Sequence, residues 1–206
     1  MATSLQEELN RTDAGFNAIF NKKDGIIFGI ILGVISFILG LIVLYLVKDF
    51  KSFWAVMSTS IIVNTGIYVV VAAILAFFLR KRVGDYWSFS VALKTIYVML
   101  AISTLISTTG TQALVNFVYP TLQEEVLNNT INVTIEYMEK SNLPDDQIDG
   151  KIAELEVQRD SIGKLTFGQF FKGMAITLVV QFIFALMLSA IFKREKPMFR
   201  KASENE

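Results

Sequence analysis

Long apolar stretches with little or no charge alternate with short charged ones along this chain. The first, residues 25–47, would form a helix of roughly 34 Å, long enough to cross a bilayer hydrocarbon core of about 30 Å. Three further stretches have the same character, residues 53–79, 92–119 and 173–192. Pro120 ends the third, because a residue that precedes proline disfavours the helical conformation. The pattern predicts an all-α integral membrane protein with four transmembrane helices, the first three of them within residues 25–119.

The remaining residues form three parts. Residues 1–24 are polar and carry Ser4 and Glu7 at capping-box spacing, which indicates a short helix at the membrane interface. This long polar lead also argues that the first apolar stretch is a retained span and not a cleaved signal peptide. Residues 120–172 hold two helix-compatible stretches separated by "SNLP", and they predict a helical hairpin outside the membrane. Residues 173–206 hold the fourth span and a basic tail.

The distribution of Lys and Arg around the spans predicts the orientation of the chain. Cytoplasmic loops of membrane proteins carry an excess of these residues. One side of the membrane receives Lys22, Lys23, Arg80, Lys81, Arg82, Lys94, Lys193, Arg194, Lys196, Arg200 and Lys201, while the other side has Lys48, Lys51, Lys164 and Lys172 near the spans. We therefore expect both termini in the cytoplasm and the hairpin on the opposite side.

Small residues recur on one face of the first and of the fourth span, at steps of three and four residues. This predicted helix-packing face consists of Gly25, Gly29, Gly33, Ser36 and Gly40 in the first span and of Gly173, Thr177, Gln181, Ala185 and Ser189 in the fourth. Small residues let helix backbones approach in a bilayer, so each face predicts a contact, within the chain or with a second copy. The alternative is that glycine is simply frequent in membrane helices. We expect Gln181 to turn inward and find a partner, because an amide facing lipid is costly.

The third span is rich in hydroxyl and amide side chains, and the second span adds two more. The candidate polar-lining residues are Asn64, Thr65, Ser103, Ser107, Thr108, Gln112 and Asn116. They fit a path for a solute or, more simply, hydrogen bonds between helices and back to their own helix. No acidic or basic side chain lies deep in a span, although proton-coupled transporters usually need one. The simpler interpretation is favoured by the sequence.

Composition argues against catalytic chemistry. The 206 residues include no Cys and no His, which removes thiolate and imidazole groups as nucleophiles, general bases and metal ligands. The stretch "DDQIDGKIAELE" has part of the spacing of a calcium loop, but Gln147 and Ala153 stand where ligands are needed, so a helix start is favoured. A formal net charge of zero gives no sign of a nucleic-acid partner. We expect no enzyme activity, no catalytic residue, no metal and no cofactor.

Three stretches carry a resemblance to a known family. The basic "RKRVGDYWSFSVALK" leads into the third span, "VNFVYP" ends it, and "LTFGQFFKGM" leads into the fourth. Over about residues 20–195 the chain resembles the family called domain of unknown function 4199, which is typical of Bacteroidota. That family has no established activity, so the resemblance transfers no catalytic residue. It implies a place in the inner membrane of a Gram-negative cell, with the hairpin in the periplasm.

Two functions fit these features. The first is a non-enzymatic accessory or interaction subunit, surrounded by the lipid bilayer and associated with itself or with another membrane protein through its small-residue faces. The alternative is a channel or transporter for a small solute, lined by the Ser/Thr-rich third span. Water-accessible hydroxyl groups on that span would favour the alternative.

Overall fold

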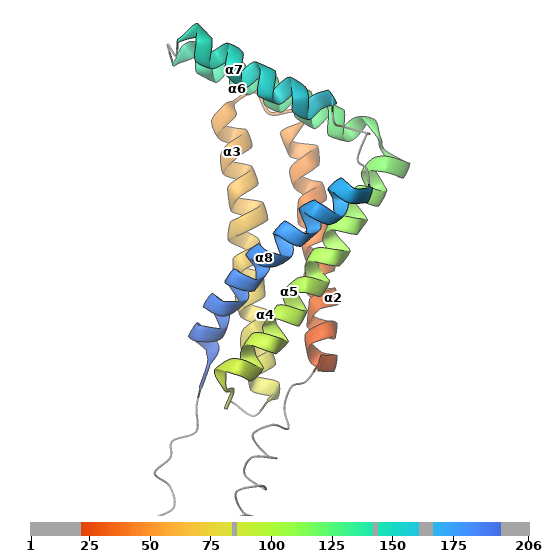
Figure 1. Ribbon diagram of the computed structural model, residues 1–206, viewed down its shortest axis with the longest axis vertical. Coiled ribbons are helices and arrows are strands. Elements are labelled where there is room, and N and C mark those ends of the chain that lie inside the picture. The colour runs from red at the N-terminus through yellow and green to blue at the C-terminus, as the bar shows by residue number, and fades with distance from the viewer. Residues whose placement is uncertain (1–21, 84–85, 142–143, 161–166, 195–206) are drawn as a thin grey trace, which may run out of the picture.

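Helices account for nearly all of the structure (Figure 1). The computed structural model describes residues 22–83, 86–141, 144–160 and 167–194. Within these residues there is no strand, and one isolated bridge pairs the backbones of Trp87 and Arg194. Residues 1–21, 84–85, 142–143, 161–166 and 195–206 lie outside the described part, and most of the predicted interfacial helix falls among them.

Four helical segments are long and apolar enough to cross a membrane. They are α2 (Lys22–Val47), the continuous run of α3 (Phe53–Ile61), η1 (Ile62–Ile67) and α4 (Tyr68–Arg82), the run of α5 (Phe89–Ala113) and η2 (Leu114–Val118), and α8 (Phe167–Phe192). The coarse prediction is confirmed: the described chain is all-helical and has four helices long and apolar enough to cross a membrane. The prediction placed the start of the fourth span at residue 173, whereas α8 begins earlier, at Phe167. The helix can include Lys172 because its long side chain can reach the headgroups.

The four spans run alternately up and down, so two ends of the bundle can be distinguished. The basic end holds Lys22, Arg82 and Arg194. There Arg82 pairs with Asp24 at 3.0 Å, and the backbones of Trp87 and Arg194 exchange hydrogen bonds of 2.8 and 2.9 Å. The α6 end is the opposite one, which the helices α6 and α7 cover in Figure 1.

Two spans depart from regular α-helix. The segment η1 is π-helical in the middle of the second span, and η2 is π-helical at the end of the third. Each carries a Val-Asn pair, Val63–Asn64 in η1 and Val115–Asn116 in η2. Such widened turns in helices occur frequently at functional sites. The two π-helical turns were not predicted from the sequence.

The closest approach of two helices joins α2 and α5. A Cβ atom on Gly25 would lie 3.1 Å from the carbonyl oxygen of Thr95, and one on Gly29 would lie 2.8 Å from that of Met99. At Gly33 a Cβ would lie 2.9 Å from the Cβ of Ile106. Real Cβ atoms essentially never come within 3.0 Å of such atoms, as they would at Gly29 and Gly33, and the 3.1 Å at Gly25 is tighter than most real contacts. The glycines are therefore what allows α2 and α5 to pack at this distance.

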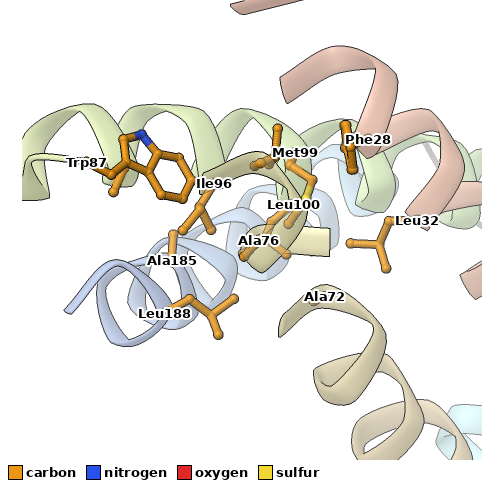
Figure 2. Packing of buried hydrophobic residues seen from close by; sticks show 12 residues of the cluster. Phe28, Leu32, Ala72, Ala76, Trp87, Ile96, Met99, Leu100, Ala185 and Leu188 are labelled. Carbon is orange, nitrogen blue, oxygen red and sulfur yellow. The ribbon is translucent and has the colours of Figure 1, made fainter. Parts of the chain in front are cut away.

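An apolar core fills the half of the bundle near the basic end, and all four spans contribute to it. Its buried members are Phe28, Leu32, Ala72, Ala76, Leu79, Trp87, Ala92, Ile96, Met99, Leu100, Ala185 and Leu188. Figure 2 shows Trp87 beside Ile96, with Ala185 and Leu188 of α8 approaching from the opposite side. Lipid tails are as apolar as these side chains, so moving the side chains from lipid into the core gains little hydrophobic free energy. The stability of such a core therefore comes mainly from close packing.

The helices α6 (Thr121–Lys140) and α7 (Asp145–Asp160) contact each other and lie across the α6 end (Figure 1). Asn129 of α6 donates two hydrogen bonds, of 2.6 and 2.7 Å, to the carbonyl oxygens of Val47 and Phe50. The ring of Tyr137 stacks on Phe53, with centroids 4.5 Å apart. These contacts fix α6 on the ends of α2 and α3. The whole of 145–160 is helical, as the interpretation of a helix start predicted.

Candidate functional site

A polar cavity of about 460 Å³ lies between the spans in the half of the bundle nearer the α6 end. Helix α2, the segment η1 with the first residue of α4, helix α5 and helix α8 all line it. Its lining consists of Ser36, Leu39, Gly40, Val43, Leu44, Val63, Asn64, Tyr68, Thr104, Ser107, Thr108, Thr111, Gln112, Thr177 and Gln181. Cavities of this size commonly hold small molecules.

The polar wall of the cavity is built mostly by α5. The sequence positions of its lining residues are separated alternately by three and by one, which places them on one broad face of the helix. These residues are Thr104, Ser107, Thr108, Thr111 and Gln112. Every polar group in the lining is a hydroxyl or an amide, so the cavity contains neither a carboxylate nor an ammonium or guanidinium group. The site can therefore form hydrogen bonds with a ligand, but it has no charged group that could neutralise a charge on that ligand.

Several of these hydroxyl groups already donate to their own helix. Ser36 donates to the carbonyl oxygen of Leu32 at 2.7 Å, and Thr177 donates to that of Gly173 at 3.0 Å. A hydroxyl has one proton to donate and two lone pairs to accept with. Ser36 and Thr177 are therefore left as acceptors toward the cavity.

Two amide side chains differ in their hydrogen bonding. Gln181 accepts a hydrogen bond of 3.3 Å from the hydroxyl of Tyr68, which connects α8 to α4. The Nε2 atom of Gln112 is buried and has no hydrogen-bond partner within the described chain. A buried donor without a partner costs about 1–3 kcal/mol, and such groups are rare in native structures. Gln112 thus holds an unused donor beside the cavity that it lines.

The structure brings together four of the seven candidate polar-lining residues, Asn64, Ser107, Thr108 and Gln112. Ser103 is fully buried outside the lining. Thr65 and Asn116 are exposed and do not line the cavity. Val63 and Asn64 both line the cavity, and Thr65 follows about 100° further around the helix, which turns it away from the face that they share.

The predicted packing face of the first span divides into two parts. Gly25, Gly29 and Gly33 lie against α5. Ser36 and Gly40 line the cavity instead, and a Cβ on Gly40 would meet only the hydroxyl oxygen of Thr111, at 4.0 Å. The stripe of small residues thus passes from a tight contact to the wall of a cavity.

The stripe of the fourth span divides in the same way, except at its first member. Ala185 and Ser189 are buried, and Thr177 and Gln181 line the cavity. Gly173 is exposed, with nothing within 4 Å of where its Cβ would be, so it packs against no part of the described chain. A packing contact of Gly173 within the described chain is therefore absent, and a contact with a second copy stays a prediction. At this end of α8 the neighbouring Met174 is the less exposed residue, so the inward face is rotated by one position.

Sequence reasoning missed Tyr68, Thr104 and Thr111 as members of the site. Thr104 and Thr111 share a face with Ser107 and Thr108 at helical spacing, so the sequence contained that signal. Tyr68 stands alone in the apolar run "IYVVVAA" and gives no such signal. Its place opposite Gln181 depends on how α4 and α8 cross.

The two ends of the bundle differ in charge. Eight basic residues of the described chain belong to the basic end, Lys22, Lys23, Arg80, Lys81, Arg82, Lys94, Lys193 and Arg194. The helix α6 at the other end carries Glu124, Glu125, Glu136 and Glu139 with one lysine, Lys140. Glu125 lies 3.9 Å from Lys48 of the loop after α2. The cavity is therefore nearer the acidic end.

Comparison with known families gives one match. The chain matches DUF4199, a family described as a protein of unknown function, over residues 23–194. This covers most of the chain, which therefore belongs to that family. Neither a curated protein nor a solved structure matches the chain significantly.

Proposed function

We propose that this member of the DUF4199 family is a non-enzymatic protein of the inner membrane that binds a small, uncharged polar molecule or headgroup in the cavity between its spans. One observation carries the proposal. Four spans converge to surround a cavity with hydroxyl and amide groups, and the Gln112 donor among them is unused. This arrangement favours the solute-handling alternative of the sequence analysis over a purely structural role for the polar third span.

The absence of charge in the lining defines the class of ligand. An ion taken from water into a site of low dielectric loses hydration that only an opposite charge or several oriented dipoles can replace. The cavity offers only hydroxyls and amides, and several of these donate to their own helix. A neutral molecule with hydroxyl or carbonyl groups is the ligand that these groups match.

The orientation of the site follows from the charge difference between the ends. The excess of Lys and Arg at the basic end supports a cytoplasmic location for that end and for both termini. The apolar core then separates the cavity from the cytoplasm, and α6 and α7 lie outside. Cysteines introduced at Lys140 and at Lys193 are expected to react with an impermeant thiol reagent from opposite sides of the membrane. Reaction of both from the same side would contradict this orientation.

The cavity can be tested by cysteine labelling, because the chain has no cysteine of its own. In proteoliposomes, Thr108→Cys is expected to react with a small impermeant thiol reagent added on the α6 side, and erythritol, a neutral polyol, should slow the reaction. Thr109→Cys is the matched control, since Thr109 is exposed on another face of α5. If both cysteines react equally slowly, or if lactate protects Thr108→Cys as well as erythritol does, the proposal is wrong.

A second candidate, the interaction subunit, is supported by the way α6 and α7 are held. Contacts through Asn129 and Tyr137 fix α6 on the spans, while α7 contacts α6 alone among the described elements. The outer helix is thus presented at a fixed position, with Val157 exposed on it. Purification of the tagged chain from its native membrane in mild detergent, with the mass of the intact complex measured, tests this candidate. A stable complex with another protein would support it, and a monomer would oppose it.

A further inference from the structure

Two walls of the cavity make no contact with each other. The segment η1 contributes Asn64 and helix α8 contributes Thr177, and both residues are exposed. Helix α8 contacts α5 and α4, but neither α3 nor η1 within the described chain. In Figure 1, α3 and the first half of α8 diverge toward the α6 end. The cavity is therefore open on the side between η1 and α8, at a depth where the surroundings are lipid.

The edges of this side opening are apolar. Ile61 precedes Asn64 by three residues and so lies on the same face of its helix, and its exposed fraction is 59%. Val180 follows Thr177 by three residues and is 57% exposed. A molecule in the opening would meet polar groups inside and apolar side chains outside. This order of surfaces matches an amphiphile and does not match a wholly polar solute.

We propose that the ligand of the cavity is a lipid with an uncharged headgroup that bears a hydroxyl group, and that it enters from the bilayer between η1 and α8. Diacylglycerol represents this class. The inference rests on the proposed function, because it names the source of the polar group that the cavity binds. The headgroup occupies the cavity, and the acyl chains remain in the bilayer along Ile61 and Val180.

The chemistry of such a headgroup complements the lining. Gln112 lines the cavity, and a rotation of its amide group would turn the buried, unpartnered Nε2 toward an ester carbonyl or hydroxyl oxygen that accepts its hydrogen bond. The headgroup hydroxyl can in turn donate to Ser36 or Thr177, whose own protons are already used within their helices. A phosphate-bearing headgroup would bring a negative charge into a site that has no cation. The site is therefore expected to select neutral lipids over the anionic phospholipids around it.

Photochemical labelling in nanodiscs tests this inference directly. The full chain is placed in phosphatidylcholine nanodiscs that contain a trace of diacylglycerol with a diazirine in one acyl chain or, in a parallel sample, phosphatidylglycerol with the same acyl chains. Labelling by diacylglycerol should exceed labelling by phosphatidylglycerol and should map to peptides of α3, η1 and α8. Gln112→Leu should reduce the selective labelling about tenfold, the effect of losing one hydrogen bond in a site without water. Thr108→Val, which removes a hydroxyl at nearly constant volume, is the second variant, and Thr109→Val is its matched control.

The results separate this inference from the proposed function. Equal labelling by the two lipids, or labelling that Gln112→Leu and Thr108→Val leave unchanged, would overturn the lipid assignment. A dimer in which a second copy covers the opening and prevents labelling would overturn it too. The reactivity of Thr108→Cys and its protection by erythritol would stand in either case, and the ligand would then arrive from water. If Thr108→Cys reacts neither with the impermeant reagent nor with a membrane-permeant one, the proposed function itself fails.

Discussion

Near the basic end, the four spans meet through glycines and apolar side chains, whereas toward the α6 end the same spans separate around hydroxyl and amide groups. The first half contains Trp87, Met99 and Leu100 with almost no exposed surface. The second half contains the cavity and the unpartnered Gln112. Since both halves are built from the same helices, the difference lies in the residues at successive turns and not in the kind of element.

Helix α2 shows this change along a single stripe. At Gly29 the backbone of α5 is so close that no side chain fits, whereas at Gly40 the nearest atom to a Cβ would be 4.0 Å away. The helices are thus held together at one end and diverge at the other. A well-packed half that positions a less packed one is a common design for binding sites, because the rigid part fixes the geometry of the groups that bind. The comparison predicts that substitutions in the two halves change the free energy of unfolding by different amounts and even in opposite directions.

The largest effect is expected for Gly29→Leu. A Cβ at this position would lie 2.8 Å from the carbonyl oxygen of Met99, which belongs to the backbone and cannot move aside without displacing α5. Overpacking typically costs about 1–3 kcal/mol and occasionally more, and the need to shift a backbone puts this variant at the upper end, about 3 kcal/mol. We expect the free energy of unfolding in detergent to fall by at least about this amount, with loss of the folded protein from the membrane fraction.

Two glycines serve as controls for Gly29→Leu. Gly40→Ala adds a methyl group in open space, and Gly173→Leu adds a side chain where nothing lies within 4 Å. Both should leave the stability unchanged or raise it by up to about 1 kcal/mol, because glycine is a weak helix former. If Gly29→Leu were as stable as these two variants, the close contact of α2 with α5 would not hold the bundle together.

The four spans and the packing face of α2 can be predicted from the sequence, but the partner of that face cannot. Hydropathy is sufficient for the four spans, because a bilayer requires about 20 apolar residues in a row. The spacing of the glycines singles out one face of α2, and that face lies against α5. The partner of that face could not be predicted, because α5 meets Gly29 and Gly33 with Ile102 and Ile106, which form no recognisable motif.

The cavity could be predicted only in part, for a related reason. The polar residues of α5 are evident in the sequence, yet a cavity also needs opposite walls. Those walls are Ser36, Asn64 and Gln181, which come from three other helices, and their meeting depends on crossing angles that a sequence does not state. The π-helical turn at η1 is equally hidden, because it depends on the packing of the whole span. Local patterns therefore predict faces, while the site arises from the way that the faces meet.

Asn129→Leu should have the next largest effect, and it concerns the α6 end alone. The variant removes the donor of both hydrogen bonds to Val47 and Phe50, and the carbonyl oxygen of Val47 then keeps only the 3.3 Å bond from the backbone N–H of Phe50. A loss of about 2 kcal/mol is expected for the contact of α6 with the spans. Hydrogen exchange of the amides of α6 measures it, and exchange should become faster there while the amides of α2 near Gly29 keep their protection. Asn128→Leu is the matched control, because Asn128 does not bond to Val47 or Phe50. Faster exchange in both halves would show that the halves are not independent.

Gln112→Leu should change stability in the opposite direction. The buried Nε2 atom lacks a partner in the described chain, and leucine fills a similar volume without that cost. We expect the ligand-free protein to gain about 1 kcal/mol in the free energy of unfolding, while it loses binding in the cavity. Thermal unfolding in detergent, with and without added diacylglycerol, measures both effects. Loss of stability comparable to that of Asn129→Leu would mean that Gln112 supports the fold and is not reserved for a ligand.

The smallest effect is expected for Arg82→Gln at the basic end. Arg82 pairs with Asp24 at 3.0 Å and lies over the ring of Phe28, yet its side chain is 57% exposed. An ion pair in such a position contributes about 0–1 kcal/mol, and salt weakens it further. The difference in unfolding free energy between wild type and variant should therefore be small and should shrink between about 0.05 and 0.5 M NaCl. A large, salt-sensitive loss would mean that charge closes the basic end, and the contrast between a packed half and a polar half would then need a different physical basis.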